Sequence, residues 1–325
     1  MTPSMEKVRR VMEEHLLERY GEEFVVGEIG TRMFKDTEYY QARIYPKSII
    51  GTNKAGDTYY YAEVNVDRLS FGRLRKPGDT YGQVQVRVRC EEFLMPKVKE
   101  LFGERVKIKP EIDYYRRNMF GSMAGYLSPD FDEILENSIK DPENHRLELE
   151  LYIYIFDRID DDAEKEERRQ QIFDFVQYLK GEGLFEYLEL GVIFIDERVL
   201  APSYREYRDK IYSIEEETEV EGEIVYLPPE DFRREMSEVL QEEVDQMSEE
   251  EILERMDRIR KKDLSELSGY NARNATFIYS FGMLEENYSS SISKEDKERD
   301  YSKLEHIKLG NNLKYIYLKG VKINE

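Results

Sequence analysis

The chain has 325 residues, of which 40% are hydrophobic and 12% are aromatic, so it can bury a hydrophobic core. Its length is sufficient for about two domains. Basic and acidic residues number 22 and 19 in residues 1–127 (+3), 18 and 43 in residues 128–270 (−25), and 9 and 8 in residues 271–325 (+1). No stretch approaches the roughly 18 apolar residues of a membrane helix. The acidic balance also disfavours general nucleic-acid binding. We expect no transmembrane segment in this chain and no nucleic-acid partner.

The first part of the chain predicts the order α-β-β-β-α-β. Val8, Met12 and Leu16 recur at helical spacing, between Ser4 as a cap and Gly21 as a stop. A second helix is expected between Asp79 as its cap and Gly103 as its stop, with a kink or break at Pro96. The expected elements are a helix at Met5–Tyr20, strands at Phe24–Ile29, Tyr39–Tyr45 and Tyr59–Val66, a helix from about Thr80 to Phe102, and a strand at Arg105–Glu111.

A stretch rich in Gly and Pro, Asn118–Asn144, separates this part from a second region, and only a short helix near Asp132–Ile139 is expected within it. We therefore predict a near-neutral α+β domain at 1–127 and an acidic α+β domain at 128–325. The second region should contain a β-α-β unit at His145–Asp157, Asp162–Lys180 and Tyr187–Asp196, a hairpin within Tyr204–Leu227 that turns near Glu221-Gly222, helices at Glu230–Gln246 and Glu249–Lys262, a strand at Thr276–Met283, and a C-terminal hairpin around Gly310-Asn311-Asn312. The predicted fold class is α+β.

No catalytic motif is present in the sequence. Cys90 is the only cysteine, so no intramolecular disulfide can form, and a buried structural thiol is favoured over a nucleophile. One acidic cluster could hold Ca²⁺ through oxygen ligands, but carboxylates at the start of a helix are expected from the helix dipole alone. This cluster contains Asp157, Asp160, Asp161, Asp162, Glu164, Glu166 and Glu167. We expect no cofactor and no metal site.

A second acidic run lies on the predicted hairpin and its turn. Like charges packed together there repel one another unless a partner offsets them, so the run is a candidate docking edge for a basic protein or a component of the cell envelope. The interpretation favoured for this run alone is that the charges protect an exposed strand from aggregation. The candidate partner-binding residues are Glu215, Glu216, Glu217, Glu219, Glu221 and Glu223.

Basic residues gather in the first half of the chain, without the glycine-rich loop of a nucleotide site. Phosphate binding is conceivable, but contacts with the acidic half of the same chain are the favoured interpretation. The residues concerned are Arg68, Arg73, Arg75, Lys76, Arg87 and Arg89.

Residues 5–111 show a resemblance to a known group of proteins. The segments Glu18–Val26, Tyr39–Lys47 and Lys99–Gly103 are similar to those of uncharacterised surface lipoproteins of Gram-positive, Firmicutes-type bacteria. In that group these elements follow a signal peptide and a lipidated Cys, which this sequence does not contain. The resemblance implies an extracytoplasmic domain anchored to the membrane through such a leader, and it brings no catalytic residues.

Three functions remain open from the sequence. The favoured hypothesis is a non-enzymatic binding protein of the bacterial cell surface with an unknown ligand. The second is a cytoplasmic, acidic immunity-type protein that neutralises a basic toxin by charge complementarity. The third is a hydrolase with a carboxylate acid/base pair, although nothing selects two of the 70 acidic residues.

Overall fold

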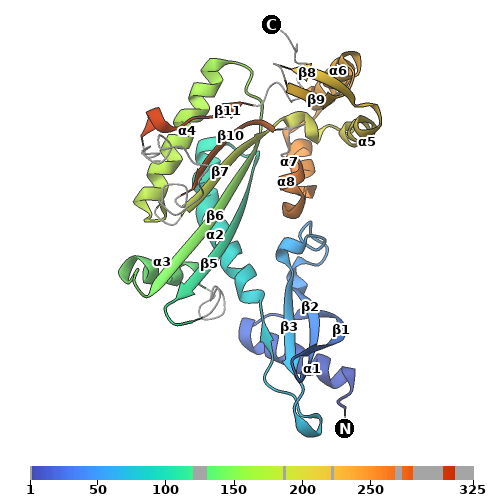
Figure 1. Ribbon diagram of the computed structural model, residues 1–325, viewed down its shortest axis with the longest axis vertical. Helices are drawn as coiled ribbons and strands as arrows, with labels where there is room; N and C mark the ends of the chain where they lie inside the picture. Colours follow the sequence, from blue (N-terminus) through green and yellow to red (C-terminus); the bar gives the residue numbers. More distant parts are fainter. Residues whose placement is uncertain are drawn as a thin grey trace. The chain divides into compact units, whose positions relative to one another are not determined.

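The computed structural model describes residues 2–119, 130–185, 188–220, 223–267, 273–280 and 303–311 (Figure 1). It has a mixed α+β fold, which confirms the predicted class. The chain forms two compact units. Unit 1 comprises Met1–Cys90, Ile112–Leu147 and Arg260–Lys262, and unit 2 comprises Glu91–Glu111, Glu148–Ile259 and Asp263–Glu325. The boundary at residue 127, drawn from charge and composition, stays a prediction.

Unit 1 is built on an antiparallel sheet with the strand order β1-β2-β3-β4. Its helix α1 packs on the sheet through Val8, Met12 and Leu16, which are fully buried with sheet residues such as Tyr40 and Ile44. The elements are α1 (Met5–Tyr20), β1 (Phe24–Phe34), β2 (Thr37–Pro46), β3 (Ala62–Asp67), β4 (Gly78–Asp79) and α3 (Phe131–Lys140).

The ends of α1 agree with the sequence prediction. The Ser4 side chain accepts a hydrogen bond from the backbone N–H of Lys7, and Gly21 takes the left-handed conformation (φ 70°) that a residue without Cβ adopts without strain. The strand expected from Tyr59 begins later, at Ala62. Thr58–Tyr60 is instead a turn of 3₁₀ helix, because the Asp57 carboxylate accepts from the N–H of Tyr59 at 3.0 Å and caps it.

Helix α2 (Tyr81–Phe102) runs through Pro96 as one continuous element, which confirms the predicted helix and excludes a break there. A kink at Pro96 stays a prediction. The end signals are confirmed: Asp79 accepts from the N–H of Tyr81 at 3.0 Å, and Gly103 has φ +86°. Burial of Leu94 and Val98 on either side of Pro96 explains why the helix continues, since packing of both halves opposes the local cost of the proline.

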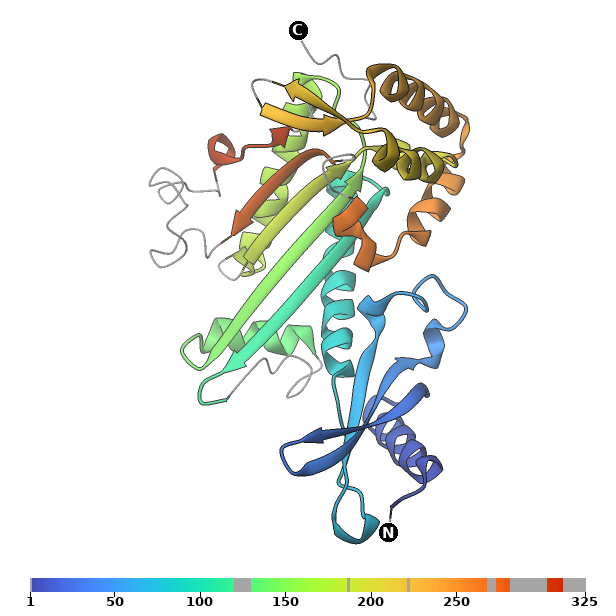
Figure 2. The same cartoon turned by 45° about the vertical axis from the view of Figure 1, so that its right-hand side comes forward.

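Unit 2 contains most of a sheet with the strand order β11-β10-β7-β6-β5. β6 and β7 are parallel, as the predicted β-α-β unit requires, and β10 is antiparallel to β7. The bounds are β5 (Val106–Arg116), β6 (His145–Phe156), α4 (Asp162–Gly181), β7 (Leu188–Ile195), β10 (Arg273–Ser280) and β11 (Gly310–Asn311). Figures 1 and 2 show α4 along the sheet, and its Phe175 meets Phe102 of α2 in an edge contact with ring centroids 6.0 Å apart.

A second core lies beyond the carboxyl ends of β6 and β7. Phe156 and Ile195 end these strands and pack with Leu227, Met236 and Leu240. The elements around this core are α5 (Tyr204–Ile214), β8 (Glu216–Val220), β9 (Glu223–Leu227), α6 (Glu230–Gln246), α7 (Glu249–Arg258) and α8 (Leu264–Leu267).

The hairpin expected within Tyr204–Leu227 is confirmed only for its second half. Residues Tyr204–Ile214 form helix α5 because Tyr204, Tyr207 and Ile211 recur at helical spacing and pack on this core. Tyrosine is common in strands, but burial of this helical stripe decides the conformation.

Helix α6 has the predicted bounds, and the capping box of Ser248 and Glu251 at the start of α7 is confirmed. α7 ends at Arg258 instead of Lys262, because Ile259 is extended and residues 260–262 belong to unit 1. Gly310 and Asn311, expected in a turn, form β11 beside β10, while Asn312 and residues 281–283 lie outside the described residues. No helix in the described ranges is long and apolar enough to cross a membrane.

Candidate functional site

The acidic run lies on a two-stranded sheet formed by β8 and β9 (Figure 1). Glu217 lies opposite Tyr226, and Glu219 lies opposite Ile224. Residues paired across an antiparallel ribbon share a face, and so do residues two apart on one strand. These four side chains therefore share one face of the hairpin, and all four are exposed.

This face combines negative charge with exposed apolar surface. Ile224 is 66% exposed and Tyr226 is 62% exposed. These values are high for large apolar side chains, because their exposure to water costs free energy. In the described part of the chain, β8 and β9 pair only with each other, so each strand also has an outer edge. We call the face formed by Glu217, Glu219, Ile224 and Tyr226 the acidic hairpin face.

Three of the other four candidate residues lie near the ends of the hairpin. Glu215 follows α5 as its C-cap, and Glu216 pairs with Leu227 at the base of the hairpin. Glu223 pairs with Val220 next to the turn, and Glu221 lies outside the described residues. The sequence identified the acidic residues, but it did not single out Ile224 and Tyr226, although their alternation with Val225 could have signalled it.

The base of the hairpin is fixed to α6. Leu227 is 2% exposed and lies in the core with Met236 and Leu240. Directly after it, the carbonyl of Pro228 accepts from Nε of Arg233 at 3.0 Å, and Arg233 is itself buried. The acidic hairpin face is therefore anchored on a packed helix.

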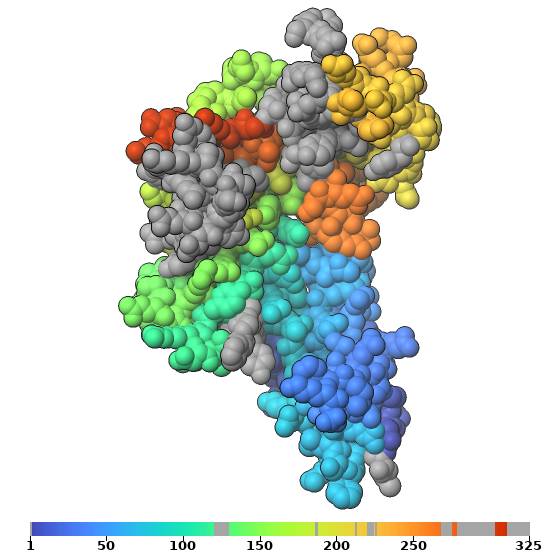
Figure 3. Space-filling view, viewed as in Figure 1, coloured from blue at the N-terminus to red at the C-terminus, as the bar shows by residue number. Residues whose placement is uncertain are grey.

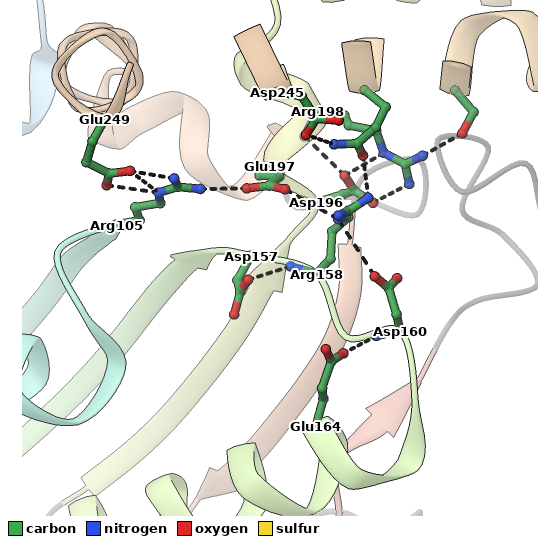
Figure 4. A network of polar contacts seen from close by, with 12 residues as sticks. Arg105, Asp157, Arg158, Asp160, Glu164, Asp196, Glu197, Arg198, Asp245 and Glu249 are labelled. Carbon is green, nitrogen blue, oxygen red and sulfur yellow. Dashed lines mark hydrogen bonds and ion pairs between the residues drawn. The ribbon is translucent and has the colours of Figure 1, made fainter. Parts of the chain in front are cut away.

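A buried ion pair fixes α6 to the end of β7 (Figure 4). Asp196 follows β7 and accepts from Arg198 Nε at 2.9 Å and from Arg198 Nη2 at 2.7 Å, a two-point contact between a fully buried carboxylate and a guanidinium that is 4% exposed. Arg198 also donates to the hydroxyl of Ser237 on α6. Nearby, Ser203 donates to Glu243 of α6 through its N–H at 2.8 Å and through its hydroxyl.

A second group of charges surrounds Glu197 (Figure 4). Arg105, which precedes β5, donates to Glu197 at 2.6 Å and to Glu249 of α7 at 3.0 Å, and Arg158 lies 3.3 Å from Glu197. Burial raises the pKa of Glu197 although both guanidiniums oppose the shift. The hydrogen bond from Arg105 lowers the pKa of the more exposed Glu249. These charges balance one another and connect β5, β6, β7 and α7.

Several carboxylates of the candidate Ca²⁺ cluster already make hydrogen bonds or ion pairs within the chain. Asp161 caps α4 by accepting from the N–H of Glu164 at 2.8 Å, and Glu164 in turn accepts from the N–H of Asp160 at 2.6 Å. Asp157 pairs with Arg168. Within the described ranges no group of three or more His, Cys, Asp or Glu side chains is arranged to hold a metal ion. The helix-start interpretation accounts for Asp160, Asp161 and Glu164.

The basic residues of the first half are partly paired inside unit 1. Arg68 contacts Glu38 at 2.9 Å and Arg75 contacts Asp67 at 3.1 Å, both within the same sheet region. The expectation that these two arginines pair with the acidic half is therefore wrong, since nearer carboxylates lie on neighbouring strands. Cys90 is fully buried, as expected, and burial raises the pKa of its thiol, which disfavours the reactive thiolate form.

Unit 1 also contains a buried carboxylate that joins three of its elements. Asp79 accepts from His15 Nε2 at 2.9 Å, from Arg19 at 3.1 Å and from the hydroxyl of Tyr20 at 2.5 Å, besides capping α2. Burial, with the Asp79 hydrogen bond, raises the pKa of Tyr20. This His–Asp contact ties α1 to β4 and α2, and it is a structural anchor.

A lysine that sequence reasoning missed lies in an aromatic cluster of unit 1. The backbone N–H of Lys261 donates to Asp57 at 2.5 Å, and its ammonium lies 4.9 Å from the ring centre of Tyr59 and 5.6 Å from that of Tyr60. Arg87 lies over the Tyr59 ring at 4.6 Å. The rings of Tyr59 and Tyr60 lie at an interplanar angle of 84°, and both make cation–π contacts.

The environment of Lys261 weakens its positive charge. Burial, which is the largest cause, and the positive charges of Lys54 and Arg87 together lower its pKa to about 7, while Asp57 opposes the shift. An amine that is neutral near pH 7 is chemically nucleophilic. Lys261 is only 5% exposed, which shields it from dissolved substrates, so its effect is on stability. No signal in the sequence around Lys261 marks it, because Asp57 and Tyr59 lie about two hundred residues away.

Comparison with known proteins gives one distant similarity. The sequence matches no protein-family model, and no curated protein matches it. Among solved structures, the chain is similar to a DUF5037 family protein from Ruminococcus gnavus, with a TM-score of 0.35 and 14% identity, over 62% of this chain and 79% of that one.

Proposed function

We propose that this chain is a non-enzymatic binding protein of the bacterial cell surface and that the acidic hairpin face binds a basic partner. The observation that carries the proposal is the combination of Glu217 and Glu219 with the exposed Ile224 and Tyr226 on one face. Charge alone would fit a strand protected from aggregation. Exposed apolar side chains on the same face instead favour a contact surface.

The chemistry of the face defines the partner. Carboxylates two residues apart on β8 complement lysine or arginine at alternate positions of an extended segment, and Ile224 and Tyr226 complement the apolar methylene stems of those same side chains. The outer strand edges allow such a segment to add to the sheet through backbone hydrogen bonds. We therefore propose a partner that presents a basic strand.

The rigid base supports this proposal. Leu227 and the Pro228–Arg233 hydrogen bond hold the hairpin on α6. Arg198, which pairs with Asp196 after β7, holds α6 by donating to the hydroxyl of Ser237. A surface fixed before binding loses less conformational entropy when it binds.

The proposal is tested by titrating the full chain with a short synthetic peptide that alternates lysine and valine. Each lost ion pair is worth roughly 0.2–1 kcal/mol and reversal adds repulsion, so Glu217→Lys with Glu219→Lys should weaken binding by about tenfold. The matched control is Glu238→Lys with Glu242→Lys, which reverses two exposed charges on α6. Equal affinity of both double variants would contradict the proposal.

The apolar part of the face has its own test. Replacing Ile224 and Tyr226 by serine should weaken binding of the same peptide without changing its dependence on salt. If only the charged residues matter, the interaction is general electrostatic attraction and the specific face is refuted.

Location is tested separately from binding. Antibody labelling of intact cells of the source organism should detect the protein before the cells are permeabilised. Labelling that requires permeabilisation would contradict a position on the cell surface.

A further inference from the structure

Two loops of unit 1 project from the same end of its sheet. Met33 of β1 pairs with Glu38 of β2, and the carbonyl of Glu38 accepts from the N–H of Arg68, next to β3, at 2.9 Å. This row crosses three neighbouring strands. The β1–β2 turn and the loop after β3 therefore leave the sheet side by side, and the latter protrudes from unit 1 in Figures 2 and 3. We call residues 32–38 and 67–76 together the basic tip.

The basic tip exposes large apolar side chains. Phe71 is 88% exposed, Phe34 67%, Met33 64% and Leu69 42%. Two of them lie in each loop, so both loops contribute. Apolar side chains gathered at a protruding end of a unit mark a surface that becomes buried in a partner or in a membrane.

The charge of the basic tip has the opposite sign to that of the whole chain. Its two segments contain six Lys and Arg residues against three Asp and Glu residues, a net charge of +3 in a chain of net charge −21. Two of the carboxylates, Glu38 and Asp67, already pair with Arg68 and Arg75. Arg73 and Lys76 are exposed as well. The tip therefore attracts anionic surfaces.

Phe71 combines a strained backbone conformation with an aromatic side chain. The N–H of Leu69 donates to the carbonyl of Arg73 at 2.8 Å and closes a tight loop around it. At the apex, Phe71 has φ 61° and ψ 24°, a left-handed conformation that costs a bulky residue stability. Glycine would suit this position better. An aromatic side chain kept exposed at such a position points to a role in contact with something outside the protein.

We propose that the basic tip binds the surface of an anionic lipid bilayer, with Phe71 and Phe34 inserted among the headgroups and Arg73 and Lys76 near the lipid phosphates. Rings that protrude from two separate loops fit a soft, planar surface, whereas a folded partner would need two matching pockets. Lysine and arginine near such a surface each gain from the negative potential of anionic lipids. This site lies in unit 1 and is independent of the acidic hairpin face.

The test is co-sedimentation of the full chain with vesicles of phosphatidylcholine that contain about one third phosphatidylglycerol, compared with pure phosphatidylcholine. Binding should require phosphatidylglycerol and weaken as salt rises. Because burial of a phenylalanine ring is a large favourable contribution, Phe71→Gly should lower binding by about tenfold or more. The same variant should not lower the melting temperature, because it removes the left-handed strain. Arg73→Glu with Lys76→Glu should lower both the binding and its salt dependence.

A matched control distinguishes the tip from exposed apolar surface in general. Ile50 is 52% exposed and follows the opposite end of β2, so Ile50→Ser should bind vesicles like the unchanged chain. Equal binding to both kinds of vesicle, or unchanged binding by Phe71→Gly, would overturn the proposal. If the chain does not bind vesicles but forms a dimer in sedimentation velocity, and Phe71→Gly abolishes that dimer, then the basic tip binds a second copy of the chain instead.

Discussion

Replacement of Lys261 by methionine should stabilise unit 1. The substitution keeps a long, flexible, apolar side chain against Tyr59 and Tyr60 and removes the buried ammonium. The backbone N–H of residue 261 remains available to Asp57. The change therefore isolates the free energy of placing a charge at this position.

The magnitude follows from the pKa. A buried Lys261 with a pKa of about 7, against an ordinary value of 10.5, corresponds to at most about 5 kcal/mol of penalty for the charged form. The cation–π contacts with the two rings offset roughly 1–2 kcal/mol of this penalty. We expect Lys261→Met to gain about 3 kcal/mol in the free energy of unfolding at and below pH 7.

The pH dependence has a defined sign. Between pH 7 and 10.5 the unfolded chain binds more protons at this site than the folded chain, so the stability of the unchanged protein rises with pH across this window. The gain from Lys261→Met should be constant below about pH 7 and vanish as the pH approaches 10.5.

The assay is urea unfolding of the full chain across this pH range, followed by tyrosine fluorescence. Lys262→Met is the matched control, because Lys262 is adjacent and exposed and should change stability by less than about 0.5 kcal/mol. A loss of stability in Lys261→Met, or a gain that does not depend on pH, would refute the reasoning.

Three further predictions concern stability, each measured by denaturant unfolding of the full chain. Arg198→Met should cost about 3–5 kcal/mol of unfolding free energy because it leaves the Asp196 carboxylate buried without its cation. Adding Asp196→Asn should restore much of this loss. If the losses of the two single variants simply add in the double variant, the coupling is contradicted. Tyr20→Phe should cost about 1–3 kcal/mol, since it removes a donor to buried Asp79; an unchanged midpoint would show that water replaces the hydroxyl. Pro96→Ala should stabilise α2 by about 1–3 kcal/mol by restoring a helical hydrogen bond, and a loss would mean that the ring packs usefully.

Sequence patterns predicted elements whose signals are local. The bounds of α1 and α6 follow from helical spacing and end residues. The two apolar strands on either side of α4 were predicted as a β-α-β unit, and the structure pairs them, β6 and β7, in parallel. The predicted hairpin pairs β8 with β9, with Val220 opposite Glu223, while the predicted turn at Glu221-Gly222 lies outside the described residues. In each case neighbouring residues carry the information.

The failures arise from contacts between residues distant in sequence. α5 is helical because Tyr207 and Ile211 find a core assembled from other elements, whereas tyrosine alone suggests strand. α7 stops early because residues 260–262 belong to unit 1, where Lys261 meets Asp57. The charged half of the candidate site could be read from its glutamates, but the exposure of Ile224 and Tyr226 depends on which face of the hairpin covers the core.

The central claim is that the acidic hairpin face is the binding surface. The most direct measurement is hydrogen exchange, read by mass spectrometry, of the full chain with and without the alternating lysine–valine peptide. We predict slower exchange of backbone N–H groups in residues 216–227, where the peptide adds to a strand edge, and unchanged exchange in α6. Protection confined to other segments, or no protection at a peptide concentration that saturates binding, would contradict the claim.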